Sequence, residues 1–210
     1  MTLIVEGASL TLRYPVPDDA AELFALGSEP SVTRFFSWGP YTAADQALTF
    51  IESLPRRRAR GEALELLILD DGGTPVGLTG LFEVSLRDRR CVVGTWLGRR
   101  WWGTGINAAS KALILSLAFE ALGMERVTAW ADVANGRSRA ALAKLGFQHE
   151  GVLRRWHRHG DVAHDVAVLS LLREDWATGP LAAAPVSVTG RPPRLFLAAT
   201  APHGEQSRAA

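Results

Sequence analysis

The spacing of hydrophobic and polar residues divides the first third of the chain into a strand and two helices. Residues 10–14 alternate as a short strand, and a helix with one apolar face follows over residues 20–27. Thr42 is suited to cap a second helix over residues 43–54, because its hydroxyl can accept from a free backbone N–H. We expect Pro55 to end that helix and the arginines at positions 56–60 to form a solvated helix end.

Three β-prone runs follow, over residues 63–69, 76–84 and 91–97, separated by short turn sequences. Links this short predict an antiparallel meander. The segment 106–122 is apolar nearly all round, which is typical of a helix buried against a sheet, and residues 127–131 resemble a buried strand. A strand, a long crossover helix and another strand predict two parallel strands joined by a right-handed connection.

The rest of the chain predicts a capped helix, a strand pair and a tail. Asn135 is suited to cap a helix over residues 138–145. Two strands, 147–156 and 162–172, flank the turn at Gly160 and Asp161. Beyond this pair Ala, Pro, Gly and Thr dominate. We therefore expect a folded domain over residues 1–177 and a mostly flexible tail over 178–210, with residues 194–199 as a docked strand.

Composition narrows the class of protein. The 210 residues are 47% hydrophobic and 21% charged, with a net charge of +1, which fits one globular domain and gives no broad field for nucleic acid or a membrane surface. Cys91 is the single cysteine and lies in a predicted strand, so we expect a buried thiol. No secretory signal or membrane-spanning run is visible, and we expect a cytoplasmic protein with neither nucleic-acid nor membrane partners.

The sequence Arg100-Trp101-Trp102-Gly103-Thr104-Gly105 lies between a predicted strand and the long apolar helix. The first N–H groups of a helix are unpaired and carry the positive end of the helix dipole, and glycine lets a phosphate approach the main chain. Arg100 adds a cation that can contact phosphate with two N–H groups. This junction therefore predicts an anion site.

Two motifs together resemble the GCN5-related N-acetyltransferase (GNAT) family. One is the Arg/Gln-x-x-Gly-x-Gly/Ala loop at residues 100–105, and the other is the Asn-x-x-Ser…Lys-Leu-Gly-Phe-x-x-Glu-Gly pattern at residues 135–151. The resemblance covers residues 10–176, and its details are similar to the branch that acetylates the N-termini of ribosomal proteins. It implies an α/β (α+β) fold with a mixed, mostly antiparallel sheet, a parallel strand pair splayed at the acetyl-CoA site, and helices on both faces.

The resemblance also implies roles for individual residues. Acetyl-CoA would be the donor and a primary amine the acceptor, with no metal. A free strand edge would pair with the pantetheine arm, the helix start would hold the diphosphate, and Asn135 would both cap its helix and contact the arm. The N–H of Leu97 would donate to the thioester oxygen, and Ser138 would protonate the leaving thiolate. The expected cofactor-binding residues are Trp96, Leu97, Gly98, Arg100, Trp102, Gly103, Thr104, Gly105, Ile106, Asn107, Asn135 and Ser138.

Two positions depart from the family pattern and leave the acid and base open. Leu142 stands where many relatives carry a tyrosine, and Val92 stands where they often carry a glutamate. The remaining candidates for a base working through water are the three carboxylates Asp132, Glu83 and Glu150. Neutralising an α-amine near pH 7 costs about 1 kcal/mol, against about 4.5 kcal/mol for a lysine. A site without a strong base therefore favours an α-amine.

The acceptor side is less well defined by the sequence. The aromatic stretch with Phe35, Trp38 and Tyr41 is either an acceptor wall or a hydrophobic plug, and Glu83, Glu150 and His157 are further candidates for acceptor contacts. If Gly160 and Asp161 form a two-residue turn, His157 and His164 face each other with His159 on the same side. This is a spacing that metal ligands use, although solvated polar residues are the commoner outcome.

Other functions fit parts of the sequence. A dinucleotide-binding protein would share Gly103, Gly105 and Asp132, but it would continue in strand and helix repeats, which this chain does not. A non-catalytic acyl-CoA-binding relative fits the apolar Leu142 and Val92. Acetylation of a small amine such as an antibiotic, a polyamine or a metabolite remains open, as does the choice between monomer and homodimer.

Overall fold

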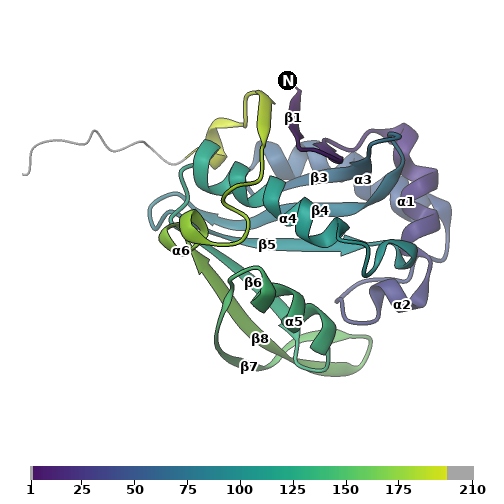
Figure 1. Ribbon diagram of the computed structural model, residues 1–210. Coiled ribbons are helices and arrows are strands. Elements are labelled where there is room, and N and C mark those ends of the chain that lie inside the picture. The colour runs from purple at the N-terminus through teal and green to yellow at the C-terminus, as the bar shows by residue number, and fades with distance from the viewer. Residues whose placement is uncertain (1, 198–210) are drawn as a thin grey trace, which may run out of the picture.

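The computed structural model describes residues 2–197, and its centre is a nine-stranded sheet in the order β7-β8-β6-β5-β4-β3-β2-β1-β9 (Figure 1). Only β5 and β6 pair in parallel among these strands; every other neighbouring pair is antiparallel. The strands are β1 (Leu3–Glu6), β2 (Leu10–Arg13), β3 (Ala63–Asp70), β4 (Pro75–Ser85), β5 (Arg90–Leu97), β6 (Arg126–Asp132), β7 (Gln148–His159), β8 (Val162–Leu172) and β9 (Ser187–Gly190).

Helices cover both faces of the sheet, as expected. One face carries α4 (Ile106–Ser116), which continues into a wider turn over Leu117–Ala121, together with α5 (Gly136–Lys144) and α6 (Arg173–Thr178). The other face carries α1 (Ala20–Gly27), α2 (Pro30–Thr33) and α3 (Ala44–Ala59). In Figure 1, α4 and α5 lie in front of the sheet and α3 lies behind it. None of the helices within residues 2–197 has the length and apolarity that crossing a bilayer requires.

Alternation along the strands divides the interior into two cores. On β5, Cys91, Val93 and Leu97 pack toward α4, whereas Trp96 packs toward α1 and α3. The α4 face is the larger core, because α4 is itself buried along most of its length. The same alternation places Ala129 and Ala131 of β6 in the α4 core. Trp130 and Asp132 therefore point to the opposite face.

The predicted meander, the crossover helix and the closing strand pair are confirmed, but the end of α3 is not where we expected it. Pro55 lies inside α3, which continues to Ala59. The arginines that follow it are also less solvated than expected. Arg57 forms an ion pair at 3.0 Å with Glu65 of β3, whose carboxylate is buried. The guanidinium of Arg58 stacks on the ring of Tyr14.

Two edge strands and a C-terminal segment differ from the expectation. β1 and β9, neither of which was predicted, pair antiparallel from Leu3↔Gly190 to Glu6↔Ser187. Residues 194–196 form a short 3₁₀ helix rather than a strand, and Phe196 is fully buried in the α4 core. The tail therefore contains a strand at residues 187–190, and residues 194–196 pack on the domain in a helical conformation instead of the expected extended one. Residues 198–210 lie outside the described part of the chain.

Candidate active site

The two parallel strands separate before they end. β5 and β6 pair from Arg90↔Arg126 to Val93↔Ala129, and the pairing stops there. Beyond Val93, β5 stays paired with β4 on one side, and the end of β6 stays paired with β8. Residues 94–97 of β5 consequently present a free edge to a gap that Trp130 and Asp132 border on the other side. This confirms the splayed pair.

The free edge places the peptide groups of Leu97 toward the gap. The N–H of Gly98 donates to the carbonyl of Val76 on the β4 side at 2.9 Å. Because the C=O and N–H of one trans peptide point in opposite directions, the carbonyl of Leu97 points away from β4. This carbonyl accepts from Nε1 of Trp102 at 2.9 Å. In an extended strand the N–H of the same residue points to the same side, so the N–H of Leu97 also faces the gap.

The loop before α4 has free backbone donors. The N–H groups of residues 103–107 donate to no carbonyl or side chain within residues 2–197. Gly103 and Gly105 have φ of +77° and +91°, and a Cβ at either would meet nothing within 4 Å. Unpaired donors at a helix start, with open space in front of them, fit a diphosphate. One expected donor is not available, because the N–H of Trp102 already donates to the carbonyl of Arg99 at 3.1 Å.

Two arginines stand beside this loop. Arg100 is exposed, and its guanidinium lies 4.6 Å from the centre of the Trp101 ring. Arg137, in the first turn of α5, lies 3.5 Å from the centre of the Trp102 ring. Arg137 was not predicted as a site residue, because its only signal in the sequence is its place two residues after the Asn135 cap. Both guanidinium groups therefore lie against the loop that precedes α4.

The start of α5 lies next to the same loop. Oδ1 of Asn135 accepts from the N–H of Ser138 at 3.1 Å, which confirms the predicted cap. The amide nitrogen of Asn135 remains for a ligand. The half-buried hydroxyl of Ser138 has no hydrogen-bond partner in the part of the chain that the structure describes. A hollow of about 230 Å³ joins these elements; it is lined by Ser31, Arg34, Phe35, Trp102, Ala134, Asn135, Gly136 and Arg137.

The aromatic stretch before α3 packs across the end of β5. The ring of Trp38 lies 5.5 Å from that of Trp96 and 5.3 Å from that of Tyr41. Burial, and secondarily the charge of Glu65, raises the pKa of Tyr41 to about 12. Trp38 and Tyr41 therefore serve as hydrophobic packing, whereas Phe35 faces the hollow beside Trp102. The plug that the sequence left open is therefore formed by Trp38 and Tyr41.

A polar cluster borders the gap on the β6 side. Asp132 is 5% exposed; its Oδ1 accepts from the N–H of Ala134 at 2.7 Å, and its Oδ2 lies 2.7 Å from Nδ1 of His164. The ring of His157 stacks on that of His164, with centroids 5.2 Å apart, which confirms that the two face each other. Burial and the neighbouring His164 lower the pKa of His157, whose Nε2 is buried without a partner within residues 2–197.

Two of the predicted carboxylates lie far from the gap. Glu83 follows Phe82, which pairs with Val92 near the start of β5. Five residues of extended strand separate Val92 from Leu97, a distance of about 17 Å. Glu150 forms an ion pair with Arg126, the first residue of β6, and this hydrogen bond is the main reason that its pKa is lowered to about 2. The structure therefore brings Asp132 to the gap but neither glutamate, because both lie where β5 and β6 begin.

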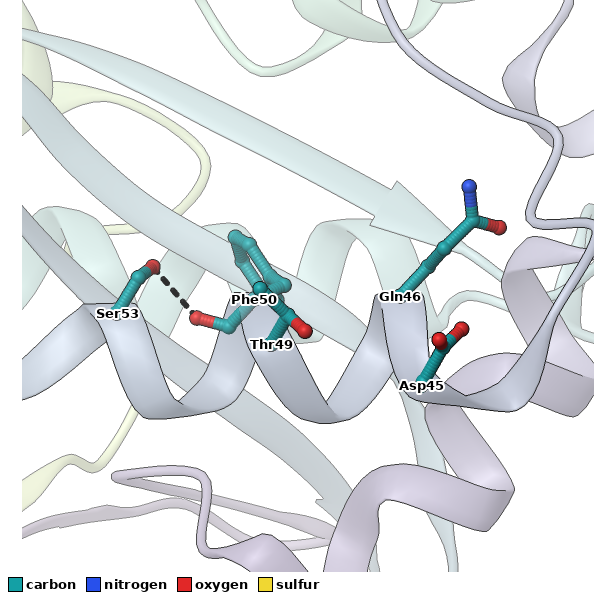
Figure 2. Close-up of a pocket in the computed structure, with 5 residues that line it drawn as sticks. All are labelled: Asp45, Gln46, Thr49, Phe50 and Ser53. Carbon is teal, nitrogen blue, oxygen red and sulfur yellow. Dashed lines mark hydrogen bonds between the residues drawn. The ribbon is translucent and has the colours of Figure 1, made fainter.

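A second hollow, of about 380 Å³, lies along α3 and is lined by Asp45, Gln46, Thr49, Phe50 and Ser53 (Figure 2). The hydroxyl of Ser53 donates to the carbonyl of Phe50 one turn earlier at 2.6 Å. No residue of the gap, of the loop before α4 or of the Asp132 cluster lines this hollow. It therefore adds nothing to the chemistry of the site.

Comparison with known proteins agrees with this geometry. Residues 9–148 match the acetyltransferase (GNAT) domain family. The chain is 30% identical over 171 residues to the putative ribosomal N-acetyltransferase YdaF of Bacillus subtilis, covering 80% of this chain and 93% of the relative. It is 29% identical to the uncharacterized N-acetyltransferase p20 of Bacillus licheniformis, covering 80% and 95%.

The fold is also found in a crystal structure of a GCN5-related N-acetyltransferase from Brucella melitensis. That structure superposes with a TM-score of 0.77 at 20% identity, covering 85% of this chain and 81% of the other. The splayed parallel pair, the free donors before α4 and the family match agree with one another. The chain belongs to the GNAT acetyltransferase family, and it is an N-acetyltransferase that uses acetyl-CoA.

Proposed function

We propose that the protein transfers the acetyl group of acetyl-CoA to a free α-amine, such as the N-terminus of a protein, by direct attack in a ternary complex. The observation that carries the choice of acceptor is the absence of a free carboxylate at the gap within residues 2–197. Asp132 is the acid that borders the gap, and both of its oxygens already have partners. A site without a free carboxylate suits an amine that loses its proton readily, and an α-amine needs only about 1 kcal/mol near pH 7.

The residues around the gap fit the donor. Residues 103–107 would hold the diphosphate with their free N–H groups, and Arg100 and Arg137 would neutralise its charge. The free edge of β5 over residues 94–97 would pair with the amides of the pantetheine arm as a neighbouring strand would, whereas the N–H of Gly98 is already used by Val76. The side-chain amide of Asn135 would contact the same arm. When bound, acetyl-CoA supplies an activated acyl group at the point where β5 and β6 separate.

Two groups are placed to act on charge that develops during the transfer. The N–H of Leu97 faces the gap and would donate to the thioester oxygen as it becomes negative. The hydroxyl of Ser138 lies in the first turn of α5, beside the hollow that contains Trp102 and Asn135. It would give its proton to the leaving thiolate and regain one from solvent.

The name of one relative points to the same class of acceptor. YdaF of Bacillus subtilis is named as a putative ribosomal N-acetyltransferase, and the chain covers nearly all of it. A ribosomal-protein N-terminus is therefore the first acceptor to test.

The experiment is an acceptor screen that measures release of the CoA thiol. The panel contains peptides with a free N-terminus, the same peptides with a blocked N-terminus and one free lysine, and small amines including polyamines. We expect the free N-termini to give the highest kcat/KM. Preference for small amines would replace the proposed acceptor. Tight binding of CoA with no thiol release from any amine would instead identify a non-catalytic binding protein.

A further inference from the structure

The cluster at the end of β6 contains a histidine that is oriented by a buried carboxylate. Oδ2 of Asp132 lies 2.7 Å from Nδ1 of His164, and the side chain of Asp132 is only 3% exposed. The other carboxylate oxygen is held by the N–H of Ala134, so the carboxylate cannot turn away. A carboxylate at Nδ1 keeps the proton on that nitrogen and leaves the lone pair on Nε2. In the part of the chain that the structure describes, Nε2 of His164 has no hydrogen-bond partner.

We propose that His164 is the general base that takes the proton of the acceptor amine, and that Asp132 is the positioning residue that holds its ring. The proposal rests on the proposed acetyl transfer and adds the missing proton acceptor to it. Val92 of β5 has an apolar side chain, and Glu83 and Glu150 lie where β5 and β6 begin. His164 and Asp132 lie instead where the two strands separate.

The cluster lies on the face of the sheet that also carries the aromatic stretch. Trp96 of β5 and Asp132 of β6 point to the same face, opposite to α4. On that face the aromatic stretch and the histidines lie on the two sides of the gap. Nε2 of His159 lies 3.1 Å from the carbonyl of Gly39, which joins the hairpin to the aromatic stretch. An acceptor on this face would meet Phe35 on one side and His164 on the other, with the donor loop at the helix start beyond.

The geometry favours a proton acceptor over a metal site. The donor atoms of Asp132, His157 and His164 lie within 4.8 Å of one another, which would suit an ion if their lone pairs converged. The two imidazole rings are instead stacked at an interplanar angle of 5°. A lone pair on imidazole lies in the plane of its ring, and parallel planes do not meet at one ion. Nδ1 of His164 is also already held by Asp132.

The titratable groups that face His164 come from the strands packed around it. Asp132 faces it from β6, and His157 and His159 approach from β7. Asp165, its neighbour on β8, accepts from the N–H of Arg155. Burial and the neighbouring His164 lower the pKa of His157, which disfavours a second positive charge beside the base. The carboxylate of Asp132 stabilises the imidazolium that forms.

The proton and electron balance of the transfer is complete with these groups. The ammonium of the acceptor gives one proton to Nε2 of His164, which later releases it to solvent. The freed nitrogen lone pair forms the C–N bond, and the carbonyl electron pair moves to oxygen near the N–H of Leu97. When that pair returns, the C–S bond breaks and the thiolate takes a proton from Ser138. The nitrogen then loses a second proton to solvent, which balances the one that Ser138 regains.

The test compares His164→Gln and Asp132→Asn with the control His149→Gln, an exposed histidine on the same hairpin. Steady-state kinetics use the best amine from the acceptor screen. We expect kcat to fall about 100-fold or more in His164→Gln, with the KM for acetyl-CoA unchanged, because general bases contribute 10²–10⁴. Asp132→Asn should also lower kcat, since an amide at Nδ1 favours the wrong tautomer. His149→Gln should match the wild type.

The dependence on pH separates a base from a structural role. As the pH approaches the pKa of the acceptor amine, solvent deprotonates the amine and the deficit of His164→Gln should shrink. A deficit that stays constant with pH, or a variant that keeps wild-type kcat, would overturn the assignment while leaving acetyl transfer intact. Stoichiometric Zn²⁺ binding that raises the Tm of the wild type but not of His164→Gln would replace the base with a metal site. If the wild type acetylates no amine, the proposed function and the base both fail.

Discussion

Nζ of Lys111 donates a hydrogen bond to the hydroxyl of Thr95, joining α4 to β5 inside the larger core. The hydroxyl of Thr95 lies 2.7 Å from that of Thr79 on β4, and the latter also donates to the carbonyl of Gly94 at 3.1 Å. No carboxylate is hydrogen-bonded or ion-paired to Lys111 within residues 2–197. Burial therefore lowers the pKa of Lys111 to about 7. The amine enters the core because its neutral form can donate to a hydroxyl.

This buried amine makes the stability of the fold depend on pH. In the unfolded chain Lys111 keeps its proton up to its ordinary pKa of 10.5, whereas in the folded chain it loses it near pH 7. Above pH 7 the unfolded state therefore holds more protons, and the free energy of unfolding rises with pH. We expect a rise of about 2 kcal/mol between pH 7 and pH 8.5, measured by urea unfolding. This window ends below the pH at which the buried Cys91 thiol would begin to oppose the trend.

Lys111→Met should remove that slope, because it takes away the group that titrates. Lys144, exposed at the end of α5, provides the control, and Lys144→Met should keep the wild-type slope. A wild-type free energy of unfolding that stays level from pH 7 to pH 8.5 would show that Lys111 is charged in the folded protein.

Gly103→Val should abolish binding of CoA, whereas the same substitution at a matched glycine outside the site should not. A side chain at position 103 would occupy the space in front of the free N–H groups, and the strain of φ at +77° adds a cost of about 1–2 kcal/mol. Gly73, in the turn between β3 and β4, has the same φ of +77° and the same open surroundings. Gly73→Val therefore has the same strain and should bind CoA normally. Isothermal titration calorimetry with CoA measures both; equal affinities would place the diphosphate elsewhere.

Much of the architecture followed from the sequence because its signals are local. The Gly103 loop, the Asn135 cap and the His157↔His164 pairing each depend on spacing within a few residues, and the structure contains all three geometries. The pairing of β1 with β9 depends on residues more than 180 positions apart, and each strand has only four residues, too few to show a clear alternation in the sequence. Pro55 was misread because the helix around it is held by burial of Ile51 and Leu54 against the sheet.

The catalytic residues were harder to predict because they too lie far apart in the sequence. Asp132 was identified by its place at a strand end, but its partner His164 lies 32 positions later, and only the sheet brings them together. Glu83 and Glu150 looked equivalent to Asp132 in the sequence. The register of β4 and the ion pair with Arg126 place them at the other end of the strands.

Ser138→Ala should lower turnover while leaving the affinity for acetyl-CoA nearly unchanged. The cap uses the backbone N–H of Ser138 rather than its hydroxyl, so alanine keeps the helix start. Loss of a proton donor to the thiolate typically lowers the rate 10²-fold or more, but water would supply part of the proton transfer in its place. We therefore expect a fall in kcat of about tenfold to 100-fold. Steady-state kinetics and calorimetry with CoA separate the two effects. Normal turnover in Ser138→Ala would show that water, and not Ser138, protonates the leaving thiolate.

The C-terminal segment should contribute to stability through Phe196. Its side chain is fully buried in the α4 core, in the segment that was expected to dock as a strand and instead docks as a short 3₁₀ helix. Phe196→Ala leaves a cavity and should lower the free energy of unfolding by about 3–5 kcal/mol. The adjacent Leu195 is 51% exposed, so Leu195→Ala should change the free energy of unfolding by less than about 0.5 kcal/mol. Urea unfolding of both variants gives the comparison, and a Phe196→Ala protein as stable as Leu195→Ala would mean that the segment does not dock in solution.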